Sequence, residues 1–171
     1  EQKLPRFLKY SPKFFSRGVI RFFQKLFHEK KFQQIHEKNH YMHGLEFVED
    51  MIEQLDITYT VKPKELKNIP STGALIVVAN HITGGSDAFT LTQLIANARE
   101  DKKVRMMVNG MLMGMEQAHE MMIPVDNIGG SISRDSLRKI NESLKNEEAL
   151  IIFPAGIVSR LGLDGIMDFP W

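Results

Sequence analysis

One stretch decides how this chain is arranged: Val78-Ala79-Asn80-His81-Ile82-Thr83-Gly84-Gly85-Ser86-Asp87-Ala88-Phe89. It follows an apolar run, 74–79, that predicts a buried strand, and it leads into an amphipathic segment, 88–98, that predicts a helix. A histidine and an aspartate therefore stand on a strand-to-helix turn. Turns of this kind expose polar side chains at the end of a sheet, where functional sites are commonly built.

The spacing of His81 and Asp87 suggests a catalytic pair. Five residues separate them, and on a continuous helix their side chains would point about 240° apart. They can meet only if the segment between them bends, and Gly84 and Gly85 allow the positive φ that a bend needs. Asp87 could then accept the Nδ1 proton of His81 and leave Nε2 as a base. The alternative is a histidine beside a helix N-cap made by Ser86 or Asp87.

A second buried strand also ends in a polar turn, in the run Leu150-Ile151-Ile152-Phe153-Pro154-Ala155-Gly156-Ile157-Val158-Ser159-Arg160. Together the two stretches resemble the glycerolipid (lysophospholipid) acyltransferases, which carry a His-four-residues-Asp motif and a later Phe-Pro-Glu-Gly-Thr-Arg-Ser motif. This chain has one more residue in the His–Asp gap, with Ser86 at the usual aspartate place. Ala155 replaces the motif glutamate and Val158 the motif arginine. In these features it is similar to a bacterial subfamily of hemolysin-like acyltransferases.

The resemblance implies an O-acyltransferase that moves a fatty acyl group from an acyl carrier protein or coenzyme A thioester to the hydroxyl of a lysolipid. His81 would be the general base, oriented by Asp87, and no metal or other cofactor is implied. The altered motif positions argue against a glycerophosphate as the acceptor, and the resemblance to this bacterial group makes a lyso-amino-acid lipid one hypothesis. Backbone amides around Gly84 and Gly85, or at Gly156, are candidates to stabilise the oxyanion. The candidate substrate-binding residues are Gly84, Gly85, Asn127, Arg134, Pro154, Gly156, Ser159 and Arg160.

The composition narrows the function classes. A hydrophobic content of 43% can fill a core, and a net charge of +1 gives no case for nucleic acid as a partner. The absence of cysteine excludes disulfides and thiolate zinc sites. No apolar run approaches the roughly 18 residues of a membrane-spanning helix. A start without Met and an apolar end at Trp171 lead us to expect that the C-terminal part of the domain is missing.

Residues 1–38 are rich in Lys, Arg and Phe. Cations and apolar side chains recur at helical spacing, which predicts a basic amphipathic helix suited to an anionic membrane surface. We therefore expect a cytoplasmic protein that is peripheral on the inner face of the cell membrane. The alternative is a helix that packs its Phe face on its own domain. If the helix binds a membrane, a rival function is possible: a non-enzymatic membrane-surface module in which His81 and Asp87 only form a cap.

The remaining pattern alternates between strands and helices. A second helix is expected over 45–55, a strand over 57–61, a loop over 62–73, strands over 104–108, 121–125 and 149–153, a helix over 134–146 and a loop-like tail. This order predicts an α/β fold with a mixed, largely parallel sheet flanked by helices and preceded by a helical pair. The domains would be an N-terminal helical region, 1–56, and an acyltransferase domain, 57–171.

Three further features have a structural and a functional interpretation. The methionines of 109–119 are typical of core filling, although Met-rich segments also line acyl pockets. Gly129 and Gly130 could form a backbone anion nest, or belong to an ordinary loop before a Ser133 cap. His36, His40 and His43 share a helical face, which favours a solvated face over a metal site.

Overall fold

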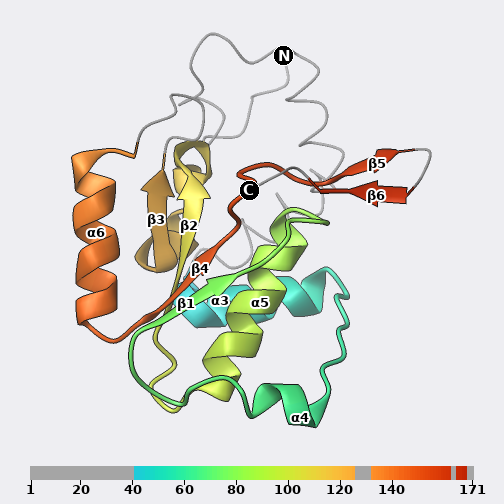
Figure 1. Cartoon of the computed structure of the whole chain (residues 1–171), viewed down its shortest axis with the longest axis horizontal. Helices are drawn as coiled ribbons and strands as arrows, with labels where there is room; N and C mark the ends of the chain where they lie inside the picture. Colours follow the sequence, from blue (N-terminus) through green and yellow to red (C-terminus); the bar gives the residue numbers. More distant parts are fainter. Residues whose placement is uncertain (1–40, 126–131, 163–164, 169–171) are drawn as a thin grey trace, which may run out of the picture.

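The computed structural model describes residues 41–125, 132–162 and 165–168. Four parallel strands form the main sheet in the order β1-β4-β2-β3 (Figure 1). They are β1 (Leu75–Val78), β4 (Ala149–Ile152), β2 (Val104–Asn109) and β3 (Met122–Val125). Because β4 lies between β1 and β2, the segments that follow β1 and β4 leave the sheet side by side. Both predicted motifs therefore start at the same edge of the sheet.

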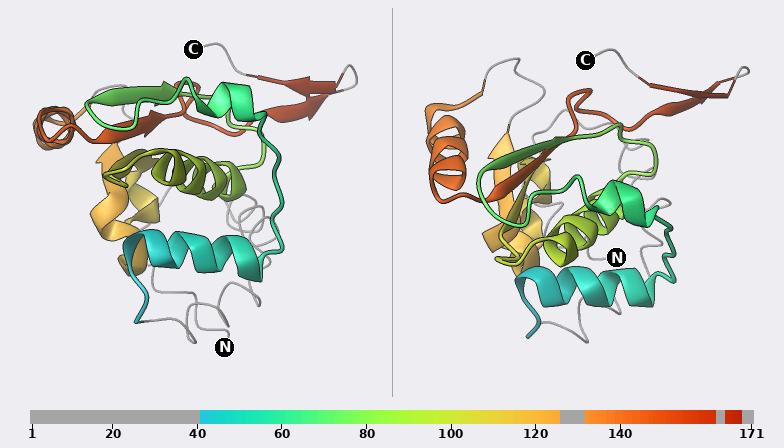
Figure 2. Two further views of the ribbon diagram at one scale, coloured as in Figure 1. Left: turned by 90° about the horizontal axis from the view of Figure 1, so that it is seen from below. Right: turned by 60° about the horizontal axis from the view of Figure 1, so that its bottom comes forward.

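Two helices cover one face of this sheet in successive layers (Figure 2). The first is α5 (Gly85–Ala98), which contacts β2 and β4, and α3 (Gly44–Gln54) packs on α5. The helix α6 (Arg134–Lys145) contacts β3 and β4. A short helix, α4 (Pro63–Leu66), lies between α3 and β1 in the chain. The parallel crossovers thus follow the α/β pattern that the alternating sequence predicts.

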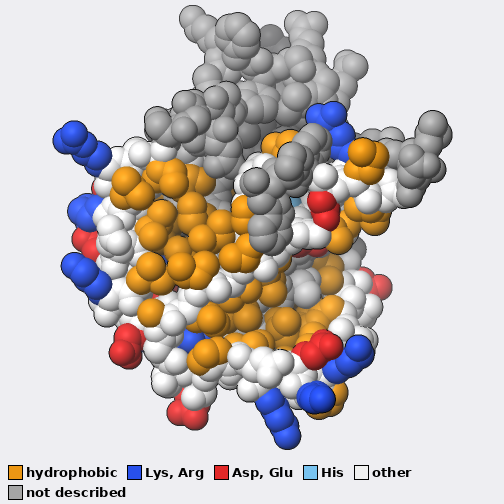
Figure 3. All heavy atoms as spheres, viewed as in Figure 1, with side chains coloured by type: hydrophobic (Ala, Val, Ile, Leu, Met, Phe, Trp, Pro, Cys, Tyr) orange, Lys and Arg blue, Asp and Glu red, His pale blue; other side chains and the backbone are white. Residues whose placement is uncertain are grey.

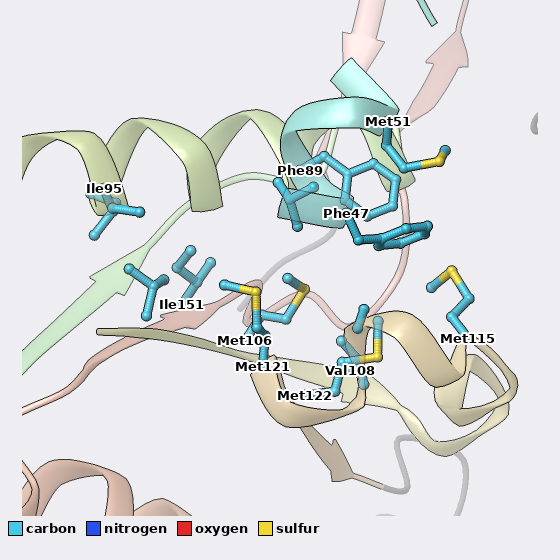
Figure 4. Close-up of a cluster of buried hydrophobic side chains, with 14 of the residues drawn as sticks. Phe47, Met51, Phe89, Ile95, Met106, Val108, Met115, Met121, Met122 and Ile151 are labelled. Atoms are coloured by element: carbon cyan, nitrogen blue, oxygen red, sulfur yellow. The ribbon is translucent and has the colours of Figure 1, made fainter. Parts of the chain in front are cut away.

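The core lies between the sheet and α5 and α3 (Figure 4). Phe47 of α3 meets Phe89 of α5 edge to face, with ring centroids 6.2 Å apart and an interplanar angle of 86°. Buried methionines fill much of the remaining space: Met51, Met106, Met115, Met121 and Met122. Two 3₁₀ segments, η2 (Gly110–Gly114) and η3 (Glu116–Met121), follow β2. Met115, which lies between them, packs in this core. Met115 thus has the core-filling role, which unbranched methionine side chains suit.

The opposite face of β1 is open. Ile76 is 51% exposed and Val78 is 45% exposed. Figure 3 shows hydrophobic side chains gathered on the side of the molecule seen in Figure 1. Parallel sheets are usually covered on both faces, so this apolar surface departs from the ordinary pattern.

The predicted α/β class with a largely parallel sheet is confirmed, and three local predictions are wrong. The segment 57–61 forms no strand: its residues run outside α5, mostly exposed, with Tyr59 hydroxyl donating to Gln93 Oε1 at 3.0 Å. Helix α5 begins at Gly85, earlier than position 88. The tail is not loop-like but holds an antiparallel hairpin, β5 (Arg160–Gly162) and β6 (Gly165–Met167).

Each error has a physical cause. Alternation in 57–61 indicated a strand, but none of the described strands pairs with this segment. A strand without a partner leaves its backbone groups unsatisfied by the sheet. The strands of the hairpin have only three residues each, too short for a periodic signal. The predicted N-terminal amphipathic helix, with His36 and His40, lies outside the described residues.

Candidate active site

His81 stands just beyond the end of β1, at the carboxyl edge of the sheet. The ladder between β1 and β4 continues one step past Val78, where Ala79 N–H donates to the Ile152 carbonyl at 3.2 Å. The His81 ring stacks on Phe153, which directly follows β4, with ring centroids 4.3 Å apart and an interplanar angle of 30°. The His81 side chain is 20% exposed. The ring is therefore held on one face and still reaches solvent.

Asp87 faces His81 from the first turn of α5. Its Oδ2 lies 3.3 Å from His81 Nδ1. The same oxygen accepts the Thr83 N–H at 2.7 Å, and Oδ1 accepts the Thr83 hydroxyl. The bend that permits this arrangement is made at Gly84, the N-cap residue of α5, whose φ is 77°. Glycine adopts a positive φ without the steric cost that a Cβ would bring.

Asp87 lies next to the N-cap of α5 without occupying it. The N-cap is Gly84, and neither Ser86 nor Asp87 occupies that position, so the predicted cap residue is wrong. Asp87 is the third residue of the helix, and its carboxylate reaches back to the backbone before the cap, much as the acidic residue of a capping box does. In this position it closes the turn and lies beside the imidazole.

The charge of Asp87 is stabilised within the site. Partial burial raises the pKa of Asp87, but the neighbouring His81 ring and the hydrogen bonds from Thr83 outweigh burial and hold the pKa below its usual value. His81 Nδ1 is buried and makes no aligned hydrogen bond, so the 3.3 Å approach of Asp87 is a close contact between the carboxylate and the ring nitrogen. Catalytic histidine–carboxylate contacts commonly become aligned only when substrate binds. An ionised carboxylate next to Nδ1 favours the tautomer with its proton on Nδ1, and Nε2 is then the basic nitrogen.

The second motif contacts the first through Ser159. Its backbone N–H donates to the His81 carbonyl at 2.6 Å, and its hydroxyl lies 3.1 Å from the same oxygen. The Ser159 hydroxyl also donates to the carboxylate of Asp168, which accepts a second hydrogen bond from Asn80 Nδ2. Ser159 therefore has a described contact with the histidine segment, although it was selected as a substrate-binding candidate.

The other candidates are spread along the same edge of the sheet. Pro154 is exposed in the turn after Phe153, and Arg160 is exposed at the start of β5. Arg134 is the first residue of α6, which follows β3 in the chain. Three strand spacings, about 14 Å, separate β3 from β1 across the sheet. The chain therefore enters α6 at Arg134 from the strand that lies farthest from β1, which leads to His81. Asn127 lies outside the described residues, as do Gly129 and Gly130.

Two details of the backbone differ from expectation. Gly85 is the first residue of α5 and has no positive φ, so Gly84 alone makes the bend. The Gly156 amide donates to the Phe153 carbonyl at 2.9 Å inside its turn, at a φ of 67°. That bond uses the proton which an oxyanion site would need, and Gly156 is therefore a turn residue rather than an oxyanion donor.

The sequence reasoning missed three residues of the site. The sequence pattern places Phe153 at the end of a strand, Thr83 in the bend between His81 and Asp87, and Asp168 in the tail. Only the pairing of β1 with β4 brings Phe153 against His81. Thr83 could have been found, because an aspartate in a first helical turn commonly accepts from the backbone just before the helix.

The described segments contain no group of three His, Cys, Asp or Glu residues that could hold a metal ion. One surface hollow lies along α6 and includes Arg134, Leu137, Arg138, Asn141, Glu142 and Lys145, but neither His81 nor Asp87. No helix within the described segments is long and apolar enough to cross a membrane.

Comparison with known proteins gives the family. A family model described as acyltransferase matches residues 2–171. The chain belongs to this acyltransferase family. The lyso-glycine lipid O-acyltransferase of Bacteroides thetaiotaomicron is 28% identical over 169 residues, 99% of this chain and 59% of the relative. The protein of the same name from Phocaeicola vulgatus is 30% identical over 163 residues, 95% of this chain and 56% of the relative.

This acyltransferase-family chain thus spans less than two thirds of the length of these curated relatives. No solved structure matches it significantly. The resemblance drawn from the two strand-end motifs is confirmed at the level of the family.

Proposed function

We propose that this protein transfers a fatty acyl group from a thioester donor to the hydroxyl of a lysolipid. The observation that carries the proposal is the approach of His81 Nδ1 to Asp87 Oδ2, at 3.3 Å, in a chain of the acyltransferase family. A half-buried imidazole with an ionised carboxylate on one nitrogen is suited to act as a general base through the other. The site lies at the carboxyl ends of parallel strands, where α/β proteins commonly bind ligands.

The reaction would proceed by direct attack of the acceptor on the donor, without an acyl-enzyme intermediate. Nε2 of His81 takes the proton of the acceptor hydroxyl as its oxygen attacks the thioester carbonyl. The C–S bond of the resulting tetrahedral intermediate breaks, and the leaving thiolate takes a proton from the imidazolium. The products are an ester and a free thiol. General-base help of this kind contributes about 10²–10⁴ to the rate.

The developing oxyanion needs hydrogen-bond donors. The first N–H groups of an α-helix have no carbonyl partner inside the helix. In α5 these are the amides of Gly85 and Ser86, since Asp87 N–H already donates to the Gly84 carbonyl at 3.1 Å. We propose these two amides as the donors in place of Gly156. A glycine at position 85 allows a substrate to approach the backbone closely.

The acceptor class is supported by the relatives, which are named for acyl transfer to a lyso-glycine lipid. We infer a lyso-amino-acid lipid of this kind as the acceptor. The donor would be an acyl carrier protein or coenzyme A thioester. The lipid acceptor is amphiphilic. The basic Phe-rich stretch 1–38 is therefore suited to hold the protein on the inner face of the cell membrane.

The rival function, a non-enzymatic membrane module, makes a different demand on the site. A histidine that only supports a cap would have its ring nitrogens satisfied by neighbouring groups. Instead, Nδ1 of His81 makes no aligned hydrogen bond, and Thr83 closes the turn with Asp87 without help from the imidazole. These contacts favour the enzyme.

The test is acyl transfer by the full chain to a lyso-glycine lipid, with acyl carrier protein or coenzyme A thioester as the donor. His81→Ala should lower the rate by about 10²–10⁴ while the fold is retained, because only the base is removed. The matched control is His43→Ala, since His43 is an exposed imidazole at the start of α3. Full activity in His81→Ala would contradict the assignment of the base. Absence of transfer by the wild-type protein to any lysolipid would contradict the function.

A further inference from the structure

The carboxylate of Asp168 joins the two motifs beside His81. Asp168 directly follows β6, and its Oδ2 accepts a hydrogen bond from Asn80 Nδ2. Its Oδ1 accepts the hydroxyl of Ser159. Asn80 precedes His81 in the chain, and Ser159 N–H donates to the His81 carbonyl at 2.6 Å. One carboxylate thus holds the residue before the histidine and the residue that binds its carbonyl.

This support begins where the sheet stops providing it. The regular pairing of β1 with β4 ends at Val78 and Ile152, and Ala79 N–H makes one more bond in the same direction. His81 is two residues further on. Beyond the strand ends, the backbone around His81 depends on hydrogen bonds from outside the sheet, and the described ones to the His81 carbonyl come from Ser159.

We propose that Asp168 is a positioning residue for His81, which it acts on through Asn80 and Ser159. This inference rests on the proposed acyl-transfer function. Asp87 and Phe153 contact the imidazole ring, whereas Asp168 sets the backbone from which the ring projects. The two contributions are both needed, because misplacement of a reacting group by 1 Å can cost about 10²-fold in rate.

A simpler role would be to anchor the β5–β6 hairpin to the rest of the protein. The same hydrogen bonds would serve that role, so loss of activity in Asp168→Ala is not enough to separate the two. An anchor affects the site whether or not the base is present. A positioning residue affects only a reaction that uses His81.

The first experiment therefore measures Asp168→Ala in two backgrounds, with acyl carrier protein thioester and a lyso-glycine lipid as substrates. In the wild-type background we expect kcat to fall about 10- to 100-fold, with KM changed less than about twofold. In the His81→Ala background we expect no further fall. An equal fall in both backgrounds, or no fall in the wild-type background, would overturn the proposal.

The second experiment reverses the direction of one hydrogen bond. Asn80→Asp sets two carboxylates against each other, and Asp168→Asn leaves one acceptor oxygen for the two hydrogen bonds from Asn80 and Ser159, so both single variants should lose activity. Combined, they place the amide on the hairpin side and the carboxylate beside His81, which restores a donor–acceptor pair of the same shape. The double variant should recover most of the lost rate. A double variant as slow as the slower single variant would count against positioning through this bond.

The third measurement does not require activity. Asp168→Ala should shift the imidazole proton signals of His81 in the NMR spectrum and leave those of His43 in place, and the reversed pair should return the His81 signals. An unchanged His81 signal would overturn the positioning role. If the wild-type protein transfers no acyl group, the proposed function fails, and the NMR comparison still decides whether Asp168 positions the histidine.

Discussion

Two polar clusters lie at opposite ends of the same parallel sheet and differ in how completely they are satisfied. At the amino ends of the strands, the Arg99 side chain is fully buried and pairs with Asp101, with Nη2 and Oδ2 2.7 Å apart. Its guanidinium also donates to the carbonyls of Pro70, Gly73 and Glu147, at 3.4, 2.9 and 2.9 Å. At the carboxyl ends, His81 Nδ1 is buried beside Asp87 without an aligned hydrogen bond.

The difference in hydrogen bonding separates a structural cluster around Arg99 from the candidate catalytic cluster around His81. Arg99 joins the segments that lead into β1, β2 and β4, and all its described contacts are with protein groups. A cation saturated in this way holds the fold and has nothing left to offer a substrate. The histidine is held by stacking and by the close approach of the Asp87 carboxylate, and catalytic hydrogen bonds of this kind commonly tighten only when substrate binds.

Removal of the buried cation should have the largest effect on stability. Arg99→Ala leaves Asp101 without its partner and three carbonyls without a donor, so the free energy of unfolding should fall by about 3–5 kcal/mol. Urea denaturation followed by circular dichroism measures it. The matched control is Arg138→Ala, because Arg138 is also an arginine with two carboxylate partners, Asp135 and Glu142, but is exposed. We expect no measurable change there, and equal losses in both variants would break the comparison.

Asp87 should show the opposite pattern, a large effect on activity and a small one on stability. Asp87→Asn keeps the shape but removes the charge that favours the correct tautomer of His81, so acyl transfer should fall by about 10²-fold. The free energy of unfolding at pH 7 should fall by only about 1 kcal/mol, the usual contribution of a hydrogen bond. A loss of stability as large as that in Arg99→Ala would place Asp87 among the structural residues.

The stability effect of Asp87 should also depend on pH. Because the pKa of Asp87 is lowered in the folded state, its stabilising contribution is complete above the ordinary aspartate value, about 4. It is lost as the pH falls through the lowered folded-state value. The difference in unfolding free energy between wild type and Asp87→Asn should therefore close below about pH 4. A difference that stays constant down to pH 2 would mean that the carboxylate charge is not its source.

The stack on Phe153 should have the smallest effect. An aromatic pair contributes about 0.5–1.5 kcal/mol beyond its burial, so Phe153→Ala should lower acyl transfer by no more than about tenfold. Phe153→Tyr retains the ring and should retain the rate. Transfer that is equally slow in the alanine and tyrosine variants would exclude stacking as the contribution of this residue.

Much of the fold could be predicted because its strands and helices have recognisable local sequence patterns. The apolar run before His81 predicted β1, and the run before Phe153 predicted β4, since short runs of apolar residues bounded by turn residues are typical of buried parallel strands. The likeness of the two strand-end motifs to a known family led to the acyltransferase class. The wrong predictions concern short stretches, 57–61, the hairpin and the first turn of α5 with its N-cap, where the pattern is too short to be decisive.

Local patterns were therefore enough for the four strands of the main sheet, for α5 and for a glycine bend between His81 and Asp87. Only the tertiary structure decided which strand ends are neighbours. Pairing of β4 with β1 places Phe153 against the His81 ring. The β5–β6 hairpin brings Asp168 next to Asn80, 88 positions away in the chain. The physical reason is that contacts between distant residues depend on how strands pair and how loops close, and no local spacing encodes either.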